Sequence, residues 1–367
     1  MDKKLQTENT LVSKTANETA VSKCDRCGAE LVFDAKKQKL SCPHCNNVVE
    51  FKIDNAEELK FEANLDKNTW LLETDVWRCP SCGAKQVVAK KDIAKSCPFC
   101  GRTNIVKSKE NENITKPNGV LPFQIDKFAA ADLALNYAKK KVYAPGFFKK
   151  HVSPEEICAM YCPAYTFDAD TESVYSGRLG KHYTTTHRDS NGRTHVRVHT
   201  RYFNISGGYN KSFDDVLVQA SAIIDGKIAK KIKGFDTNTS KKYDEKFLYG
   251  SSAEYATKTG NNCYAEAKSF IDKSIYSGIL SKYSYDVVVS LDIKSNFSNI
   301  KYKQVLLPLY LGKYYYKDKI YNFYVNGENG TVFGHYPKSG WKIFWTIFGV
   351  CALIGAGYLV YRLLGGE

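Results

Sequence analysis

Hydrophobic and polar residues follow three different patterns along the chain, and each pattern predicts a different kind of structure. Residues 1–20 are polar and contain no apolar run, so they are expected to form a disordered leader. Residues 120–337 mix helical and strand-like periodicities. Residues 341–362 are almost entirely apolar. The chain is therefore expected to combine a folded middle with a disordered start and a helical end.

The middle segment contains three helix signals. Asp126 is a suitable N-cap for an amphipathic helix that stops before Pro145. The segment Ser153-Pro154-Glu155-Glu156 is a capping box with proline at the first helical position, so a second short helix is expected from there to Pro163. Ala265–Leu280 has apolar residues at helical spacing and predicts the longest helix of this segment.

The end of the middle segment is rich in strand signals. Strands are expected at Tyr285–Ile293, Val305–Tyr316, Ile320–Val325 and Thr331–Phe333, the last two joined by a turn at Asn326-Gly327. Together with the helices, these strands predict an α+β domain over residues 120–337.

A hairpin inside this domain carries an unusual set of side chains. His182–Arg188 and Arg193–Tyr202 flank Asn191-Gly192, which is a strong signal for a two-residue turn. Alternation along the strands predicts one face made of Tyr183, Thr185, His187, Val196, Val198 and Tyr202, and an opposite face made of His182, Arg188, Arg193, His195, Arg197, His199 and Arg201.

Three interpretations of the arginine-rich face remain open. It is a solvated outer side of a half-buried sheet, or it is an anion-binding surface, or it is a histidine metal site that the surrounding arginines disfavour. The solvated outer face is the favoured interpretation. The argument for an anion-binding surface is repulsion, because guanidinium groups close together repel one another until an acidic partner neutralises them. Its residues would be Arg188, Arg193, Arg197 and Arg201.

The apolar end of the chain predicts a membrane span. Ile343–Tyr361 contains no charged residue, and its 19 residues would form a helix of roughly 28 Å, close to the hydrocarbon thickness of a bilayer. A buried core helix is the competing interpretation, but it does not explain this unbroken length. Aromatic residues lie toward both ends, as in an aromatic belt; they are Trp341, Trp345, Tyr358 and Tyr361.

The flanks of this span predict its orientation. Lys338 and Lys342 precede it and only Arg362 follows, so a single-pass protein of the cell membrane is expected, with its N-terminal bulk in the cytoplasm. Small residues at Cys351-x3-Gly355 and Ala352-x3-Ala356 form one stripe, which suggests homo-oligomers paired through the span.

Composition and charge limit the remaining choices. A chain of 367 residues with 43% hydrophobic residues is long enough for two or three domains. The formal net charge of +14 favours an acidic partner, namely nucleic acid, an anionic membrane surface or an acidic protein. The charge by itself does not choose among these partners.

Eight of the twelve cysteines lie between residues 24 and 100 and repeat one spacing. The pattern C-x2-C-x14-C-x2-C occurs twice, first within residues 21–52 and then within residues 74–106. This spacing is typical of zinc ribbons. The predicted ligands are Cys24, Cys27, Cys42 and Cys45 in the first ribbon, and Cys79, Cys82, Cys97 and Cys100 in the second. Residues 53–73 are expected to form a linker with a short helix over Asp54–Ala63, and residues 107–119 a second linker.

Disulfides and rubredoxin-like iron sites are the alternatives to zinc. Disulfides require an oxidising compartment, and iron at two such sites would need a redox partner. Zinc is favoured, at two ions per chain, and four protein ligands at each ion make the role structural. Positive φ angles are expected after each pair, at Gly28, Asn46, Gly83 and Gly101, so that backbone N–H groups face the sulfurs.

The doubled ribbon, the middle domain and the terminal span resemble a group of bacterial membrane proteins. These are labelled as transcription factor IIB-type or primosomal-protein-N′-like zinc ribbons, and they are associated with phage-shock and flotillin-like membrane stress proteins. The segments Tyr324–Gly334, followed by Pro337, and Pro163–Asp168 are similar to motifs of that family. The resemblance implies a role alongside membrane stress proteins. The primosomal-protein-N′ label is that of a helicase and implies work on DNA. However, the chain contains no phosphate-binding Gly-Lys-Ser/Thr loop.

Three classes of function follow from these observations. The favoured one is a membrane-anchored scaffold whose ribbons or middle domain recruit cytosolic or membrane-stress proteins, with anionic lipid headgroups as a further partner. The alternative is a membrane-tethered protein that binds nucleic acid through residues 21–110. Enzyme activity is not expected, because no set of nucleophile and base and no open metal site emerges.

Overall fold

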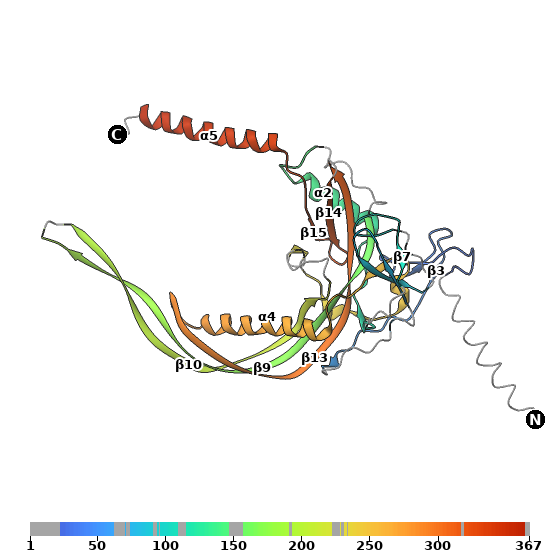
Figure 1. Cartoon of the computed structure of the whole chain (residues 1–367), viewed down its shortest axis with the longest axis horizontal. Helices are drawn as coiled ribbons and strands as arrows, with labels where there is room; N and C mark the ends of the chain where they lie inside the picture. The colour runs from blue at the N-terminus through green and yellow to red at the C-terminus, as the bar shows by residue number, and fades with distance from the viewer. Residues whose placement is uncertain are drawn as a thin grey trace, which may run out of the picture.

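The computed structural model describes residues 23–61, 70, 74–90, 94, 96–108, 115–146, 157–190, 193–221, 228, 231–232, 234–316 and 319–363. These residues form a β-rich body, a long curved arm and a projecting C-terminal helix (Figure 1). The expected leader, the capping box at residues 153–156 and the Asn191-Gly192 turn lie outside the described residues.

Three strands of unusual length run from the body into the arm. They are β9 (Ile157–Arg188), β10 (Thr194–Gln219) and β13 (Val287–Tyr316). β9 lies between the other two and pairs with both in antiparallel fashion. The two separate strands expected at 285–293 and 305–316 are therefore one continuous strand.

Two expected helices are wrong where the structure describes them. Ile157–Cys162 are extended and pair with Leu307–Gly312 of β13, although the capping box predicted a helix there. Most of these side chains are buried, and burial in a central strand outweighs a weak local helix preference. Residues 54–61 are not helical either: Asn55 forms an isolated bridge to Lys241, and β4 (Leu59–Lys60) pairs with β13.

Shorter strands widen this sheet within the body. Where β10 ends, β12 (Ser252–Glu254) takes its place beside β9 and connects it to β6 (Lys85–Ala89). The other strands of the large sheet are β5 (Thr74–Arg78), β7 (Val106–Lys107), β8 (Gly119–Val120), β11 (Lys241–Lys242), β14 (Lys319–Asn326) and β15 (Val332–Gly334). A separate sheet holds β1 (Val32–Asp34), β2 (Lys39–Ser41) and β3 (Val48–Val49). The middle domain is thus compatible with an α+β class but consists mostly of β-sheet.

The helix that begins after Asp126 is confirmed as α2 (Lys127–Lys139). The Asp126 carboxylate accepts a hydrogen bond from the Ala129 N–H at 2.7 Å, as an N-cap does. The small residues Ala130, Ala134 and Ala138 are buried in the main core of the body. α2 therefore approaches the sheet closely through alanines instead of large apolar side chains.

The longest helix expected in the middle domain is confirmed as α4 (Gly260–Leu280). Its residues Ile271, Ile275 and Ile279 are fully buried and pack in one cluster with Leu179 of β9 and Ile205 of β10. α4 lies along the concave side of the arm (Figure 1). This helix gives the arm a hydrophobic core of its own, separate from that of the body.

Three register irregularities interrupt the long strands, and two of them lie together at the base of the arm; the third lies between Val288 and Ser290 of β13. β10 shifts register between Phe213 and Val216, and β13 shifts between Ser298 and Lys301. Both irregularities lie beside the same stretch of β9, near Asp168 and Asp170, and each contains a residue with positive φ, namely Asp215 at 50° and Asn299 at 52°. Extra residues in the two outer strands bend and twist the sheet at this level.

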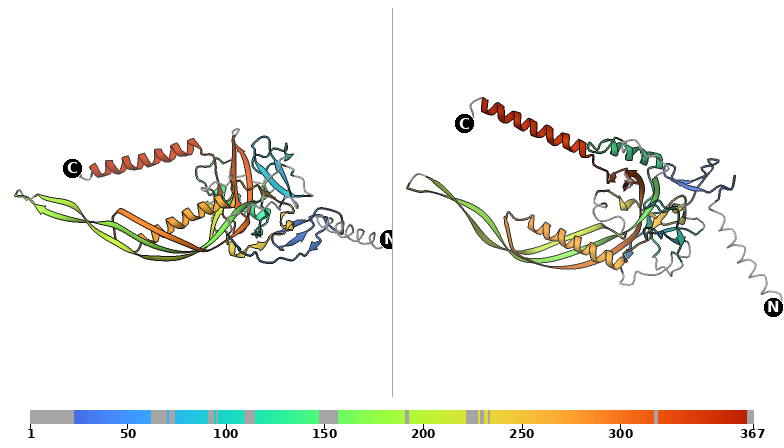
Figure 2. Two further views of the ribbon diagram at one scale, coloured as in Figure 1. Left: turned by 60° about the horizontal axis from the view of Figure 1, so that its bottom comes forward. Right: turned by 45° about the horizontal axis from the view of Figure 1, so that its top comes forward.

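The C-terminal helix α5 (Gly340–Leu363) projects away from the body (Figures 1 and 2). It is long and apolar enough to cross a membrane, and its most apolar 18-residue stretch is not buried against the rest of the described chain. Its base is held by hydrogen bonds: the Ser339 N–H donates to the Tyr143 carbonyl at 2.8 Å, and the Lys342 Nζ donates to the Ala144 carbonyl at 2.8 Å. α5 is thus fixed to the body at one end only.

Candidate metal centres

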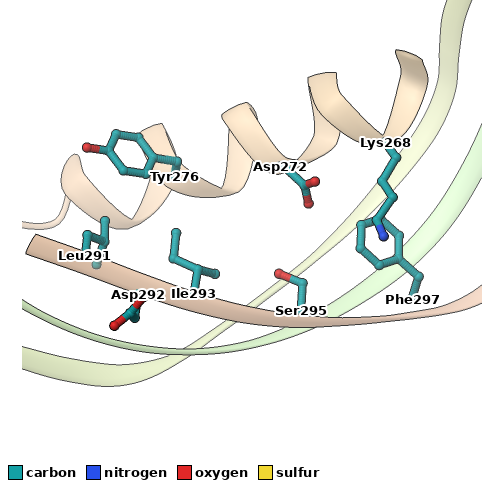
Figure 3. Close-up of a pocket in the computed structure, with 8 residues that line it drawn as sticks. All are labelled: Lys268, Asp272, Tyr276, Leu291, Asp292, Ile293, Ser295 and Phe297. Atoms are coloured by element: carbon teal, nitrogen blue, oxygen red, sulfur yellow. The ribbon is translucent and has the colours of Figure 1, made fainter. Parts of the chain in front are cut away.

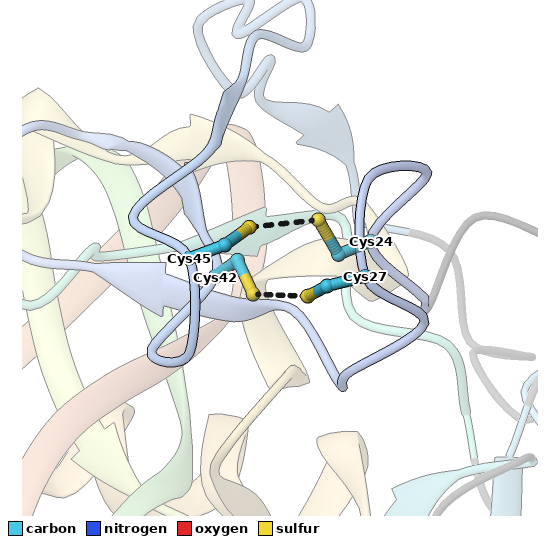
Figure 4. A group of neighbouring side chains, drawn as sticks. All are labelled: Cys24, Cys27, Cys42 and Cys45. Carbon is cyan, nitrogen blue, oxygen red and sulfur yellow. Dashed lines mark hydrogen bonds between the residues drawn. The ribbon is translucent and has the colours of Figure 1, made fainter.

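The first group of four cysteines converges on one point. The Sγ atoms of Cys24 and Cys45 are 3.5 Å apart, as are those of Cys27 and Cys42 (Figure 4). All four sulfurs lie within 4.8 Å of one another. Tetrahedral zinc with Zn–S bonds of ~2.3 Å separates its sulfurs by about 3.8 Å. The arrangement therefore fits a tetrahedral metal ion after small adjustments.

The second group repeats this geometry. The Sγ atoms of Cys79 and Cys100 are 3.5 Å apart and those of Cys82 and Cys97 are 3.6 Å apart. In both groups the outer cysteines pair with each other, as do the inner ones. The structure thus brings together all eight predicted ligands as two four-cysteine sites that can hold metal ions, consistent with two zinc ions.

Tight turns aim the thiols of each pair at the site. The expected positive φ angles are confirmed: 71° at Gly28, 57° at Asn46, 74° at Gly83 and 81° at Gly101. Each of these residues donates its N–H to the carbonyl of the first cysteine of its pair, for example Gly28 to Cys24 at 2.8 Å. The turn geometry is therefore the same four times.

Backbone N–H groups and burial give the thiols unequal acidities. Burial opposes ionisation of Cys24, but N–H groups of Arg26 and Cys27 donate to its sulfur and lower its pKa to about 6. In the second site, burial raises the pKa of Cys97 to about 12. A metal ion that binds four thiolates displaces the remaining protons, so metal affinity falls as the pH decreases.

The first ribbon is attached to the body through aromatic rings. Phe33 and Phe51 both pack against Phe247, with ring centroids 5.2 Å away in each case. The Phe33 N–H also donates to the Tyr249 carbonyl at 3.1 Å. None of the strands of this ribbon joins the large sheet. Ribbon one is therefore a module docked on the surface of the body.

The second ribbon is part of the body itself. Its strand β6 pairs with β12, where Ala253 lies opposite Val87, and β12 in turn pairs with β9. The Lys313 Nζ of β13 donates to the Cys97 carbonyl at 3.0 Å. Phe99 packs against a buried cluster that includes Met160 and Leu309. Ribbon two thus shares both its sheet and its core with the long strands.

The strand register corrects the expected faces of the hairpin at the end of the arm. Arg197 lies opposite Thr185, and His199 lies opposite Tyr183. Tyr183 and Thr185 were expected on the face of Val196 and Val198, but they lie on the face of the arginines. Arg188 pairs with Thr194 and falls on the face of Val196 and Val198. The predicted faces of the first strand were wrong because the prediction paired the residues that flank Asn191-Gly192. In the structure, the last pair of the hairpin is Arg188 with Thr194.

The remaining candidate arginines take different positions. Arg197 and Arg201 are exposed on the α4 side of the arm, together with Lys181, which lies directly opposite Arg201. Arg193 lies in the connecting loop, where its N–H donates to the Asp189 carboxylate at 2.8 Å. The structure therefore does not gather the four predicted anion-binding arginines on one face.

A third group of acidic side chains had no sequence signal, because its members are far apart in the chain. Glu58, Asp168 and Asp214 have carboxylate oxygens within 4.8 Å of one another beside the bulges. Lysines neutralise this region: the Lys301 Nζ donates to Glu58 at 3.1 Å, and the buried Lys303 lies 3.0 Å from Asp215. The group is an ion-pair network that ties β4 to the bulges.

One carboxyl of this network has an altered acidity. Burial, opposed by a hydrogen bond from the Asp215 N–H and reinforced by the nearby carboxylates of Glu58 and Asp215, raises the pKa of Asp168 to about 6. The folded state therefore binds a proton at Asp168 more tightly than the unfolded chain does. The stability that this proton contributes is lost as the pH rises through about 6.

We expect different consequences when each ribbon loses one ligand. Cys27→Ser should remove one of two zinc equivalents and leave the melting temperature of the body nearly unchanged, because ribbon one is only docked. Cys79→Ser should also remove one equivalent but lower the melting temperature of the body, because folding of β5 and β6 is coupled to their metal site. Metal analysis and thermal unfolding of the full chain in detergent would measure both. Equal melting temperatures for the two variants would contradict the assignment.

We also expect Asp168→Asn to change the pH dependence of stability. The variant keeps an acceptor for the Asp215 N–H but removes the charge that is unfavourable above pH 6. Its melting temperature, relative to the native chain, should therefore be higher at pH 7 than at pH 5. Loss of metal from the cysteine sites at low pH would affect both proteins alike, so the difference between them isolates Asp168. A pH-independent difference would show that the carboxyl does not titrate in this range.

Comparison with known proteins gives one relative of unknown role. The uncharacterized protein YdjG of Bacillus subtilis (strain 168) is 27% identical over 343 residues, which cover 93% of this chain and 96% of that protein. No family model and no solved structure matches the chain. The family resemblance inferred from the sequence stays a prediction, whereas the two groups of four cysteines and the apolar terminal helix on which it rests are present.

Proposed function

We propose that this protein is a membrane-anchored scaffold that faces the cytosol and recruits cytosolic or membrane-stress proteins through its zinc ribbons. In this proposal α5 spans the cell membrane once, and both metal sites carry structural zinc. The observation that carries the proposal is the contrast between α5, which has no buried face, and the body to which its base is hydrogen-bonded.

The positions of the ribbons support this arrangement. Ribbon one and ribbon two lie at the end of the body away from the free end of α5 (Figures 1 and 2). With α5 in a bilayer, the ribbons would therefore face the cytosol at a distance from the lipid. Four thiolates at each metal leave no open coordination position for a substrate, so a ribbon of this kind offers a surface for binding.

The arm supports a second contact, with anionic lipid headgroups. Residues 178–202 contain one acidic residue, Asp189, and six basic residues: Arg178, Lys181, Arg188, Arg193, Arg197 and Arg201. Exposed apolar side chains alternate with the arginines along β10, with Val196 61% and Val198 64% exposed. The arm and α5 leave the body toward the same side (Figure 2). A bilayer that receives α5 would therefore lie on the side of the body toward which the arm extends.

The scaffold proposal makes anchoring and recruitment separable. Deleting residues 341–367 should release the chain from membranes into the cytosol. Cys27→Ser should leave the chain in the membrane but reduce the proteins that co-purify after gentle solubilisation, because only the docked ribbon is lost. A full chain that co-purifies with nucleic acid resistant to competitor and salt would instead support the nucleic-acid alternative. Co-purified proteins unchanged by both ribbon variants, Cys27→Ser and Cys79→Ser, would contradict the scaffold.

The lipid contact is tested in lipid nanodiscs that hold the full chain. Hydrogen exchange at residues 181–201 should be slower with anionic phosphatidylglycerol than with phosphatidylcholine. Arg197→Gln with Arg201→Gln should remove most of this difference, since each basic residue near an anionic surface contributes about 1 kcal/mol. Lys139→Gln with Lys140→Gln, at the exposed C-terminal residue and C-cap of α2, is the matched control. Equal exchange in both lipids would contradict the contact.

A further inference from the structure

One edge of β13 is open within the arm. From Val287 to Ser298, β13 pairs with β9 on one side, and its other side meets β4 only at Lys301–Tyr302. Among the described residues, no strand pairs with the outer side of residues 287–299. This free edge would extend over roughly 40 Å at the rise of a β-strand. Its unpaired backbone groups are able to bind another strand.

The free edge lies beside a groove under α4. The groove has a volume of about 540 Å³ and is lined by Asp272 and Tyr276 of α4 and by Leu291, Ile293 and Phe297 of β13 (Figure 3). These three apolar side chains are only half-buried. The inner face of β13 is therefore incompletely covered by its own chain.

The position of α4 explains why the groove opens on this side. A Cβ atom at Gly278 would collide with the ring of Tyr209 on β10, so glycine lets α4 approach β10 closely. The Lys211 Nζ of β10 also donates to the Ser274 hydroxyl at 3.0 Å. α4 is thus drawn toward β10 and leaves the β13 side open.

The charges on the free edge are complementary to themselves. Residues 287–300 contain only two charged residues, Asp292 and Lys294. Both are exposed, and both alternate along the strand with the groove residues Leu291 and Ile293. Asp292 lies at the rim of the groove, and its carboxylate is directed away from α4 (Figure 3). Neither forms an ion pair within the described part of the chain. In an antiparallel pair centred on Ile293, Asp292 of each strand would lie opposite Lys294 of the other.

A second observation selects the same centre. The free edge runs from residue 287 to residue 299, with its midpoint at residue 293, and a register shift between Val288 and Ser290 makes it irregular near one end. Pairing centred on Ile293 therefore uses most of the edge and also pairs the two charges. The free edge of β10 differs, because it carries Arg197, Arg201 and Lys211, and like charges discourage edge pairing.

We propose that two copies of this chain associate through antiparallel pairing of their β13 edges about a two-fold axis at Ile293. The arms would then form one continuous sheet in the order β10–β9–β13–β13–β9–β10. The apolar residues Leu291, Ile293 and Phe297 of both copies would form the floor of a single trough between the two α4 helices. Two ion pairs between Asp292 and Lys294 would fix the register.

This symmetry is compatible with a common membrane. α5 lies on the side of the arm that carries α4 (Figures 1 and 2). A two-fold axis perpendicular to the sheet keeps the α4 sides of both arms on one side of the dimer. Both α5 helices would thus be on that side too. The dimer does not depend on the scaffold function, because its basis is the free edge of β13 and the two charges on that edge.

The test is a set of charge exchanges in the full chain, followed by sedimentation in detergent. Asp292→Lys or Lys294→Asp alone places like charges opposite each other and should weaken dimerisation roughly tenfold or more, given the size of cross-strand charge effects. The double exchange should restore the native dimer. A mixture of the two single variants should form heterodimers, although each variant alone does not dimerise well. Unchanged melting temperatures would show that the exposed substitutions leave the fold intact.

Three results would overturn the proposal. A native chain that is monomeric at the concentrations of the experiment would exclude the edge dimer. A dimer that persists in both single variants would show association elsewhere, for example through the stripe of small residues on α5. Failure of the double exchange to restore the dimer would likewise show that the edge binds in another register or binds another partner.

Discussion

The antiparallel pairing of β9 with β13 is the interaction on which the rest of the structure depends. The pairing runs from Ile157 to Gly180 on β9, and residues such as Tyr161, Phe167 and Leu179 are almost completely buried along it. β12, and through it ribbon two, attaches to one edge of this pair, whereas β4, β8 and β14 attach to the other. A shift by one residue would turn every buried side chain to the opposite face, so burial fixes the register.

The bulges convert this long sheet into a body and an arm. Asp170 of β9 contacts both outer strands, since its carboxylate accepts from the Ser212 hydroxyl at 2.6 Å and from the Asn299 side chain at 2.8 Å. Lys303 is almost completely buried and pairs with Asp215 at the β10 bulge. These polar contacts hold the irregular strands in place. The curvature of the arm is thus built into the sheet and does not depend on α4 alone.

The two metal sites have the same local geometry but different mechanical positions. Ribbon one is docked through Phe33 and Phe51, so its surface is able to change with little effect on the body. In ribbon two, β6 pairs with β12, and the Cys97 carbonyl accepts a hydrogen bond from Lys313 of β13. A metal ion held at ribbon two would therefore be coupled to the long strands, whereas one held at ribbon one would stabilise only the docked module.

Local chemistry let the sequence determine the candidate metal ligands, the turns between them and the start of α2. A C-x2-C pair followed by Gly28 or Asn46 specifies its own turn, and Asp126 specifies its own helix start, because the interacting groups are few residues apart. The uninterrupted apolar run likewise identified α5. Tertiary structure decided what depends on distant partners: the extended course of Ile157–Cys162, the joining of two expected strands into β13, and the faces of the arginine hairpin. The free edge of β13 also appeared only there, because it is defined by which strands do not reach it.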